Sequence, residues 1–232
     1  TARRGYVAKD TTSATKSDIP LIDTPQSVSV ITQDQIELLQ VQNLEQATRY
    51  TAGIISGSYG PDERFDWLTL RGFTPTQYLD GVQLPTAAIA EAQARFDTYG
   101  LEQIEVLKGP SSALYGAVPP GGLVSMISKR PQAQFAGELD AQVGNYDHYQ
   151  VNGDVTGPID EDGKVLYRLT GLWRDTGTQV DHVDSKRVFV APALTWNIAP
   201  GATLTLLSHY QKDDTGTEVQ FLPAQGTLLP NP

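Results

Sequence analysis

The second half of the chain alternates between apolar and polar residues with a period of two. Because neighbouring side chains of a β-strand point to opposite faces, this pattern predicts strands with one apolar face and one polar or mixed face. Five segments carry it: 135–143, 149–156, 165–174, 187–198 and 203–211. Segments of about ten residues with this alternation are typical of outer-membrane β-barrels. A soluble β-sandwich shows the same alternation, so the pattern alone leaves both architectures open.

The connections between these segments have different lengths at their two ends. Gly157–Lys164 and Ala199–Gly201 are short turns, whereas Asp175–Lys186 and the segment after Gln211 are longer and polar. Asn145–His148 is a short loop on the long-loop side. Short turns at one end and mostly longer loops at the other favour a membrane barrel. Four aromatic residues lie near segment ends, where an aromatic girdle is expected: Tyr149, Trp173, Trp196 and Tyr210.

The first half of the chain mixes strand and helix signals. Alternation within Thr24–Thr32 predicts a strand. Thr32 and Gln35 have the spacing of a capping box, in which two side chains satisfy free backbone N–H groups, and they predict the start of a helix. Asn43 and Gln46 repeat the spacing, so we expect two short helices in succession.

Strand signals and turn residues then alternate as far as Pro131. Trp67–Arg71 predicts a strand, and Tyr78–Leu84 predicts a hairpin with Asp80–Gly81 as its turn. Two apolar runs flank a segment rich in Gly and Pro and predict two further strands, at Ile104–Leu107 and Leu123–Ile127. Three loops connect these elements: 56–66, 74–77 and 85–99. The first half therefore predicts a compact core of short helices and strands.

Two stretches of this core resemble a known protein family. IEVLKGPSSALYG at 104–116 and PGGLVSMISKRP at 120–131 resemble the plug signature of TonB-dependent outer-membrane receptors, and Arg71–Gly72–Phe73 matches the family's RGF. The resemblance implies an α+β plug domain inside a transmembrane antiparallel β-barrel. It divides the chain into a mobile N-terminal arm (1–18), the plug (19–131) and the N-terminal part of the barrel (132–232). Plugged transporters have about 22 strands, so the chain is expected to be a fragment truncated after about five of them.

The same resemblance implies a function. Family members take up ferric siderophores across the outer membrane of Gram-negative bacteria. EVQFLPAQGTLLP at 218–230 resembles a loop of the ferrichrome and ferrioxamine receptors, which favours a hydroxamate ligand. The implied partners are TonB with its inner-membrane energising complex, the siderophore and outer-membrane lipid. The family's TonB box is not found within 1–18. The siderophore is a transported ligand, so no cofactor is expected.

The resemblance also nominates site residues. In the family, the three loops form the floor of the ligand site, and aromatic rings with a few hydrogen-bond donors suit a polar chelate. The expected ligand contacts are Tyr59, Arg64, Gln77, Arg95, Phe96 and Phe221. Arg71 and Lys108 each follow a plug strand and precede a glycine, where the family has basic residues that pair with acidic residues of the barrel wall. Lys108 stands where close relatives often have Arg, which removes a bidentate contact.

Composition excludes several other classes of function. A formal net charge of −10 argues against a nucleic-acid surface. The absence of cysteine removes thiol catalysis, and three scattered histidines give neither a zinc site nor a catalytic base at a recognisable spacing. Asp160 and Asp162 resemble calcium loops only loosely, so we expect no metal site and no enzyme. The alternatives are a receptor of this fold for cobalamin, haem or a sugar, and a soluble β-rich binding module.

Overall fold

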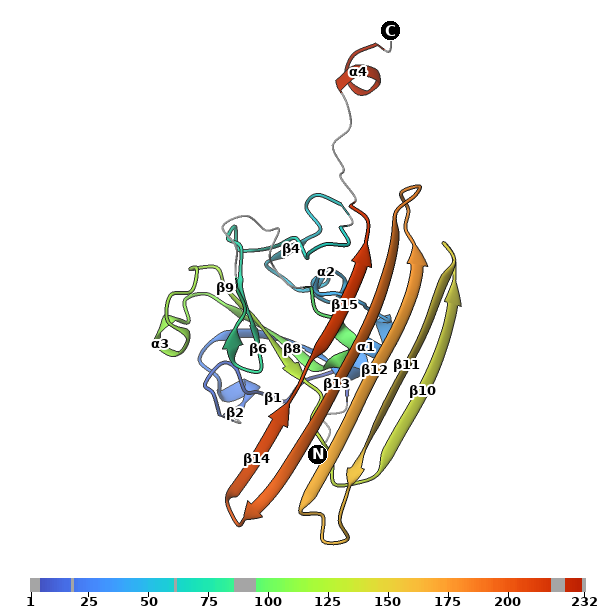
Figure 1. The fold of residues 1–232 in the computed structure, drawn as a ribbon. Helices are drawn as coiled ribbons and strands as arrows, with labels where there is room; N and C mark the ends of the chain where they lie inside the picture. Colours follow the sequence, from blue (N-terminus) through green and yellow to red (C-terminus); the bar gives the residue numbers. More distant parts are fainter. Residues whose placement is uncertain (1–4, 18, 61, 86–94, 218–223, 231–232) are drawn as a thin grey trace.

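The computed structural model describes residues 5–17, 19–60, 62–85, 95–217 and 224–230. Figure 1 shows an N-terminal domain of short strands and helices beside a long, curved antiparallel sheet, which we call the wall sheet. The helices of the described residues are short, and none is long and apolar enough to cross a membrane.

A five-stranded sheet forms the centre of the N-terminal domain. Its strand order is β3-β8-β9-β6-β7, and all neighbours are antiparallel except β6 and β9. The strands are β3 (Ser27–Thr32), β6 (Thr76–Leu79), β7 (Val82–Gln83), β8 (Leu101–Lys108) and β9 (Gly122–Ser128). Side chains of β8 and β9 supply the middle of the apolar core, and Ile104, Val106 and Met126 are fully buried there.

Two capped helices cover this core. The Thr32 side chain caps α1 (Gln33–Leu39) in a complete capping box with Gln35. The Asn43 side chain caps α2 (Leu44–Thr48) by accepting from the Gln46 backbone N–H. Both predicted helix starts are therefore confirmed. β4 (Ile54–Ser56) and β5 (Leu68–Leu70) follow and form a separate two-stranded sheet. The remaining helical elements are single turns: η1 (Leu21–Asp23), η3 (Thr98–Gly100), α3 (Ser112–Tyr115) and α4 (Ala224–Thr227).

The start of the chain differs from the predicted mobile arm. β1 (Asp10–Thr11) pairs with β2 (Ile19–Pro20), and Thr11 is fully buried. The carboxylate of Glu105, also fully buried, accepts hydrogen bonds from the Thr11 hydroxyl at 2.5 Å and from the Ser13 backbone N–H at 2.9 Å. The sequence shows a largely polar stretch without periodicity here, and it does not reveal the anchor, because the carboxylate lies on β8, far away in the sequence.

Six strands form the wall sheet in the order β10-β11-β12-β13-β14, with β15 also paired to β13. They are β10 (Ala136–Gly144), β11 (His148–Pro158), β12 (Val165–Gly177), β13 (Asp184–Ala199), β14 (Ala202–Leu207) and β15 (Tyr210–Thr215). The predicted single strand over 203–211 is thus two strands on the same edge of β13. The break at 208–209 faces Pro192 of β13, which has no N–H to donate to the ladder.

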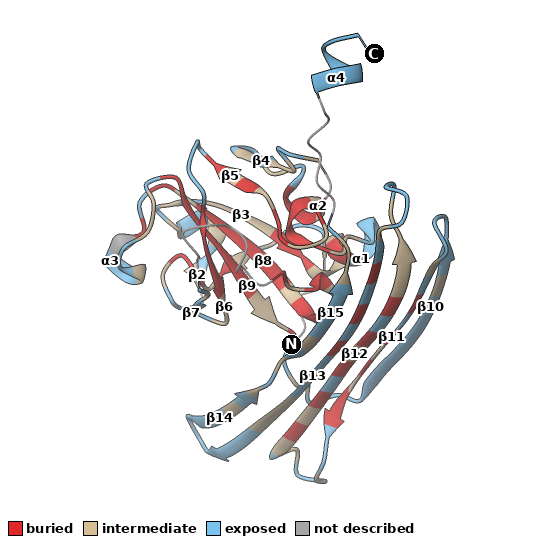
Figure 2. Ribbon diagram, turned by 45° about the horizontal axis from the view of Figure 1, so that its top comes forward, coloured by how far each residue is buried: buried red, intermediate tan, exposed pale blue. Residues whose placement is uncertain are grey.

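The two faces of the wall sheet reverse the usual arrangement of a soluble protein. Figure 2 shows buried and exposed residues alternating along β11, β12 and β13. The buried face, which packs on the N-terminal domain, is mainly polar, although Leu166, Leu172 and Phe189 also lie on it. Its buried polar residues are Gln150, Asn152, Asp154, Thr156, Arg168, Thr170, Arg174, Ser185 and Arg187. The exposed face is apolar: Leu139, Val143, Val151, Leu169, Trp173, Val188, Val190, Trp196, Leu204 and Leu206. A β-sandwich buries its apolar faces, so this sheet has the pattern of a barrel wall with its polar side inward.

Candidate functional site

The loop between β4 and β5 is held by one buried carboxylate. Asp62 accepts from the Arg64 backbone N–H at 2.9 Å, from the Arg64 guanidinium at 3.0 and 2.9 Å, and from the Trp67 indole N–H at 3.2 Å. Burial opposes ionisation of Asp62, but these hydrogen bonds outweigh it and lower its pKa. The carboxylate therefore stays charged and fixes the loop.

Aromatic rings complete this loop. Tyr59 and Phe65 both meet the Trp67 ring edge to face, with centroids 4.6 and 4.5 Å apart. The Arg64 guanidinium lies 4.7 Å from the centre of the Phe65 ring. Edge-to-face aromatic pairs add stability beyond the area that they bury. Tyr59 keeps 58% of its surface exposed and Arg64 is partly exposed, so a rigid loop presents a ring and a cation to the outside.

Gln77 does not lie in a loop, and this part of the prediction was wrong. It lies on β6, is 2% exposed, and its backbone carbonyl accepts from the Leu84 N–H. The strand begins at Thr76 because β6 pairs in parallel with β9, a contact that the short segment 74–77 does not reveal. Burial of this degree disfavours a role of Gln77 as a ligand contact.

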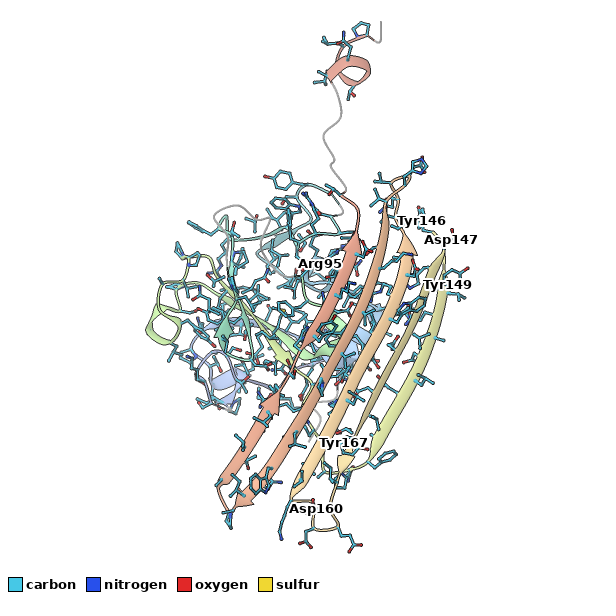
Figure 3. All side chains as sticks on the ribbon, in the orientation of Figure 1. Arg95, Tyr146, Asp147, Tyr149, Asp160 and Tyr167 are labelled. Carbon is cyan, nitrogen blue, oxygen red and sulfur yellow. The ribbon has the colours of Figure 1, made fainter. Side chains whose placement is uncertain are left out.

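Arg95 and Phe96 point into the molecule. The Arg95 guanidinium, labelled in Figure 3, lies 3.0 Å from Glu63 and 3.4 Å from Asp66. Phe96 packs against the core and meets the His209 ring at 5.0 Å. Their role as ligand contacts stays a prediction, and Phe221 lies outside the described residues.

Two further carboxyl groups meet beneath the loop. Glu45 on α2 accepts from the Trp67 backbone N–H at 2.5 Å, and burial raises its pKa to about 7. Burial also raises the pKa of Asp66, although the charge of Arg95 opposes this. Glu45 and Asp66 are close enough to repel, which adds to the raised pKa of Glu45. This cluster links α2, the loop and the segment that leads to η3.

That segment is fastened to the wall sheet by a buried ion cluster. Arg174 of β12 and Arg187 of β13 lie directly opposite each other in the sheet, a repulsive arrangement. The Asp97 carboxylate resolves it by binding both, at 2.8 and 3.1 Å, and Arg187 also binds Asp213 at 2.5 Å. Burial opposes ionisation of Asp97, but the two arginines outweigh it and lower its pKa. Sequence reasoning missed this cluster, because its members are 77 and 90 positions apart.

Uncharged contacts extend the junction. Gln211 of β15 donates to the Arg95 carbonyl at 2.6 Å and accepts from the Asp97 backbone N–H at 3.2 Å. Ser185 of β13 donates to Glu63 at 2.9 Å. The N-terminal domain is therefore attached to β12, β13 and β15 by side chains on both sides.

The two nominated cations of the plug, Arg71 and Lys108, lie near each other. The Lys108 ammonium donates to the Ser29 hydroxyl at 2.7 Å. Burial and then the charge of Arg71 lower the pKa of Lys108. Within the described residues, no carboxylate lies within ion-pair distance of either cation. Their pairing with barrel acids stays a prediction.

The residues that the structure describes form no cluster of His, Asp and Glu suited to a metal ion. Asp160 instead accepts the backbone N–H groups of Lys164 and Val165, at 3.1 and 2.7 Å, and so organises the turn between β11 and β12.

Known proteins share this architecture. The family model of the TonB-dependent receptor plug domain matches residues 20–123. A ferrioxamine B receptor of Salmonella typhimurium is 38% identical over 94% of this chain and 32% of its own length. A ferrioxamine receptor of Yersinia enterocolitica is 40% identical over 97% of this chain and 32% of its own. The ferrichrome outer membrane transporter/phage receptor of Escherichia coli is 35% identical over 97% and 30%.

A solved structure agrees in three dimensions. The ferripyoverdine receptor of the outer membrane of Pseudomonas aeruginosa matches with a TM-score of 0.88 and 27% identity, over 98% of this chain and 31% of that one. The match includes both the N-terminal domain and the wall sheet, and it confirms the predicted α+β plug with antiparallel barrel strands. The chain spans about a third of the length of the curated relatives it matches. It therefore belongs to the TonB-dependent receptors, with residues 20–123 as its plug domain.

Proposed function

We propose that the receptor to which this chain belongs takes up a ferric siderophore of the hydroxamate class across the outer membrane. The observation that carries the proposal is the identity of 35–40% with ferrioxamine and ferrichrome receptors over nearly the whole chain. The receptor acts in transport rather than as an enzyme, and the ferric siderophore is its cargo, not a cofactor.

The wall sheet supports a place in the outer membrane. Its apolar side chains face outward, as required of strands in contact with lipid, and its buried charged residues, Asp154, Arg168, Arg174 and Arg187, face the plug. Lipid is therefore the proposed partner of the outer face. TonB, with its inner-membrane energising complex, is the proposed partner that supplies the force for release.

The loop cluster, formed by Tyr59, Asp62, Arg64, Phe65 and Trp67 between β4 and β5, supports binding of the chelate at the plug surface. A ferric hydroxamate surrounds its iron with its own oxygens, so the receptor needs no metal ligand of its own. It needs flat apolar surface and hydrogen-bond donors, which the Tyr59 ring and the Arg64 guanidinium offer on a rigid loop. Arg95 and Phe96 support the floor of the site from below.

Arg71 and Lys108 are proposed to pair with carboxylates of the barrel wall outside this chain. Two neighbouring cations with no acidic partner among the described residues repel each other, and acids across the plug surface would relieve this. Removing one partner of a buried pair leaves an uncompensated charge, so such pairs hold a plug in place until it is displaced.

The test is a fluorescence titration of the full-length receptor in detergent with ferrioxamine B, ferrichrome and their iron-free forms. We expect saturable quenching by a ferric form at submicromolar concentration. Tyr59→Ala should weaken binding about tenfold or more, equivalent to about 1.4 kcal/mol. Phe96→Ala should weaken it as well, because the ring supports the floor. The matched control is Tyr50→Ala, which removes another exposed tyrosine of the plug.

No response to either hydroxamate would refute the proposed ligand class. Catecholates, cobalamin and haem would then be titrated in the same assay, because receptors of this fold carry different cargoes. Equal affinity of the Tyr59→Ala and wild-type receptors would remove the loop cluster from the site while leaving the ligand class intact.

A further inference from the structure

The plug contacts the two halves of the wall sheet in different ways. Toward β12, β13 and β15 the junction is closed: Phe189 and Asp97 have no exposed surface, and ion pairs and hydrogen bonds cross it. Toward β10 and β11 contacts cross the junction near one end, from Tyr99 to Glu138 and from Lys129 to Asp154, and beyond them the junction is open. There, the C-terminal end of α1 and the turn that follows it lie across a row of cavities from the wall sheet.

Three cavities make up this row. The first, about 620 Å³, lies at the hairpin of β10 and β11, whose residues Tyr146, Asp147 and Tyr149 mark one end of the sheet in Figure 3. The second, about 330 Å³, lies between α1 and the inner face of β10–β12. The third, about 80 Å³, lies toward the opposite end, beside Arg168.

Shared lining residues make the row continuous. Gln40, Gln42 and Gln142 line both the first and the second cavity. Glu138 lines both the second and the third. The cavities therefore follow β10 from the hairpin end of the wall sheet toward its other end.

The lining suits a neutral, amide-rich molecule. Side-chain amides of Gln142, Gln150 and Asn152 face the second cavity, and each can both donate and accept a hydrogen bond. Asn152 donates to Asp140 at 3.3 Å, and Gln150 donates to Asn152 at 2.9 Å, so the amides are already linked in one network. Glu37, Glu138 and Asp140 add carboxylates, which disfavours anions, and the paired Asp97 and Arg174 also line this cavity.

A constriction closes the row at its narrow end. The Tyr99 hydroxyl donates to Glu138 at 3.0 Å, and the Lys129 ammonium lies 4.2 Å from the centre of the Tyr99 ring. Lys129 also binds Asp154 at 2.9 Å, and Arg168 binds the same carboxylate at 2.6 Å. Burial raises the pKa of Tyr99, so its hydroxyl keeps the proton that it donates. Ligand sites for molecules of drug size occupy about 300–1,000 Å³, a size that the first two cavities reach and the third does not.

We propose that this row of cavities along β10 and β11 is the route by which the transported chelate passes the plug. This proposal rests on the proposed function, and it adds the place at which the chelate passes between the plug and the wall sheet. The plug stays attached to β12, β13 and β15, while α1 and the turn after it move away from β10 and the Tyr99–Glu138 contact opens. A neutral polar chelate would exchange hydrogen bonds with successive amides along the way.

The test introduces single cysteines into the full-length receptor, after any other cysteine has been replaced. Gln142→Cys places a thiol in the two larger cavities. Leu139→Cys, also on β10, places one on the outer face, where Leu139 is 79% exposed and lines none of the three cavities. Each variant is modified with a small and with a bulky thiol reagent, and mass spectrometry verifies the modification. Binding of ferrioxamine B is measured by fluorescence, and its uptake by cells is measured with radioactive iron.

We expect the bulky adduct at position 142 to lower uptake about tenfold or more while binding changes less than about twofold. The small adduct at 142 and both adducts at 139 should leave uptake unchanged. Normal uptake with the bulky adduct at 142 would overturn the route but not the function. Loss of binding together with uptake would place Gln142 in the primary binding site and also overturn the route. A receptor that binds and imports neither hydroxamate before modification would instead refute the proposed function.

Discussion

Gly100 lies directly against the ring of Phe189, and a Cβ built on this glycine would lie 2.4 Å from the Phe189 Cζ atom. Gly100 ends η3 in the plug, and Phe189 is a fully buried residue on β13 of the wall sheet. The plug therefore meets the wall sheet here at a position without a side chain. The neighbouring Asp97 ion cluster holds the two parts together at this distance.

Gly100→Ala should force the plug and the wall sheet apart. Overpacking a buried contact typically costs about 1–3 kcal/mol. We expect faster hydrogen exchange in η3 and along β13 of the full-length receptor in detergent, compared with wild type.

A second substitution tests whether the contact itself is responsible. Phe189→Leu shortens the opposing side chain, so the double variant Gly100→Ala/Phe189→Leu should recover part of the lost protection. If the loss of protection in the double variant equals the sum of the losses in the two single variants, the contact between Gly100 and Phe189 does not determine the distance between plug and wall sheet.

Asp97→Asn should loosen the same junction through charge. The substitution removes the carboxylate that Arg174 and Arg187 share and leaves Arg187 with Asp213, and breaking a buried pair costs about 3–5 kcal/mol. Because the pKa of Asp97 is lowered from 3.8 in the folded protein, its contribution is present above that value and is lost as the pH falls below it. Protection of η3 from hydrogen exchange should therefore decrease in acid in the wild-type receptor. In Asp97→Asn the protection should be low at every pH.

Asp162→Asn is the matched control for this experiment. Asp162 binds Lys164 at 2.9 Å, but both side chains are more than 60% exposed. Exposed pairs contribute about 0–1 kcal/mol. Equal effects of the two substitutions would show that the Asp97 cluster does not hold the plug.

Glu45→Gln should change how the loop cluster responds to pH. Glu45 has a pKa of about 7 in the folded protein against 4.5 ordinarily, so the folded state keeps a proton that the unfolded state releases. The contribution of Glu45 to stability therefore falls as the pH rises from about 4.5 to about 7. Gln keeps an acceptor for the Trp67 N–H and carries no charge, so the variant should gain on the order of 1 kcal/mol relative to wild type at pH 8.

The measurement compares hydrogen exchange of α2 and of the loop 57–67 in variant and wild type at the same pH. The ratio of rates should be near one at pH 4.5 and should favour the variant at pH 8. Glu37→Gln changes an exposed glutamate on α1 and should show no such trend. A pH-independent ratio for Glu45→Gln would contradict the raised pKa.

Local signals in the sequence predicted the elements of the fold well. The capping residues Thr32 and Asn43 predicted both helix starts, because capping acts within a few residues of the backbone groups that it satisfies. The turn Asp80–Gly81 predicted its hairpin for the same reason. Alternation predicted the wall strands but not which face is buried, since that depends on what the sheet packs against.

Contacts between distant residues were beyond the reach of these signals. The anchoring of Thr11 by Glu105 joins positions 94 apart, and the Asp97–Arg187 pair joins positions 90 apart. The splitting of the last wall strand depends on Pro192 of its neighbour. Loop composition suffices to nominate Tyr59 and Arg64, and their role as ligand contacts stays a prediction. The ion cluster of Asp97, Arg174 and Arg187 was not predicted, because the approach of distant segments in three dimensions creates it.

Glu105→Gln should release the beginning of the chain. The carboxylate accepts from the Thr11 hydroxyl and from the Thr12 and Ser13 backbone N–H groups, and an amide offers one acceptor oxygen in place of two. Hydrogen bonds to a charged group contribute about 1.5–3 kcal/mol. Exchange at residues 10–15 should rise about tenfold or more, because 1.4 kcal/mol corresponds to tenfold.

Glu102→Gln, on the same strand, is the control for the arm. Glu102 takes no part in these hydrogen bonds, so its variant should keep wild-type exchange at residues 10–15. Unchanged exchange in Glu105→Gln would mean that the pairing of β1 with β2 suffices to hold the arm.

Leu169→Lys tests whether the apolar face of the wall sheet contacts lipid. Leu169 lies on the outer face of β12 and is 47% exposed, so in water a lysine there would cost little. In a bilayer, Lys near the midplane of a barrel strand costs about 2–4 kcal/mol, and the cost falls toward the interfaces. Denaturant unfolding of the full-length receptor in lipid vesicles should therefore show a loss of this size. Val180→Lys, in the loop between β12 and β13, should show little loss, because this loop lies beyond the ends of the strands. Equal, small losses at both positions would mean that Leu169 faces water, and the outer-membrane assignment would fail on the feature that most distinguishes this sheet from a soluble one.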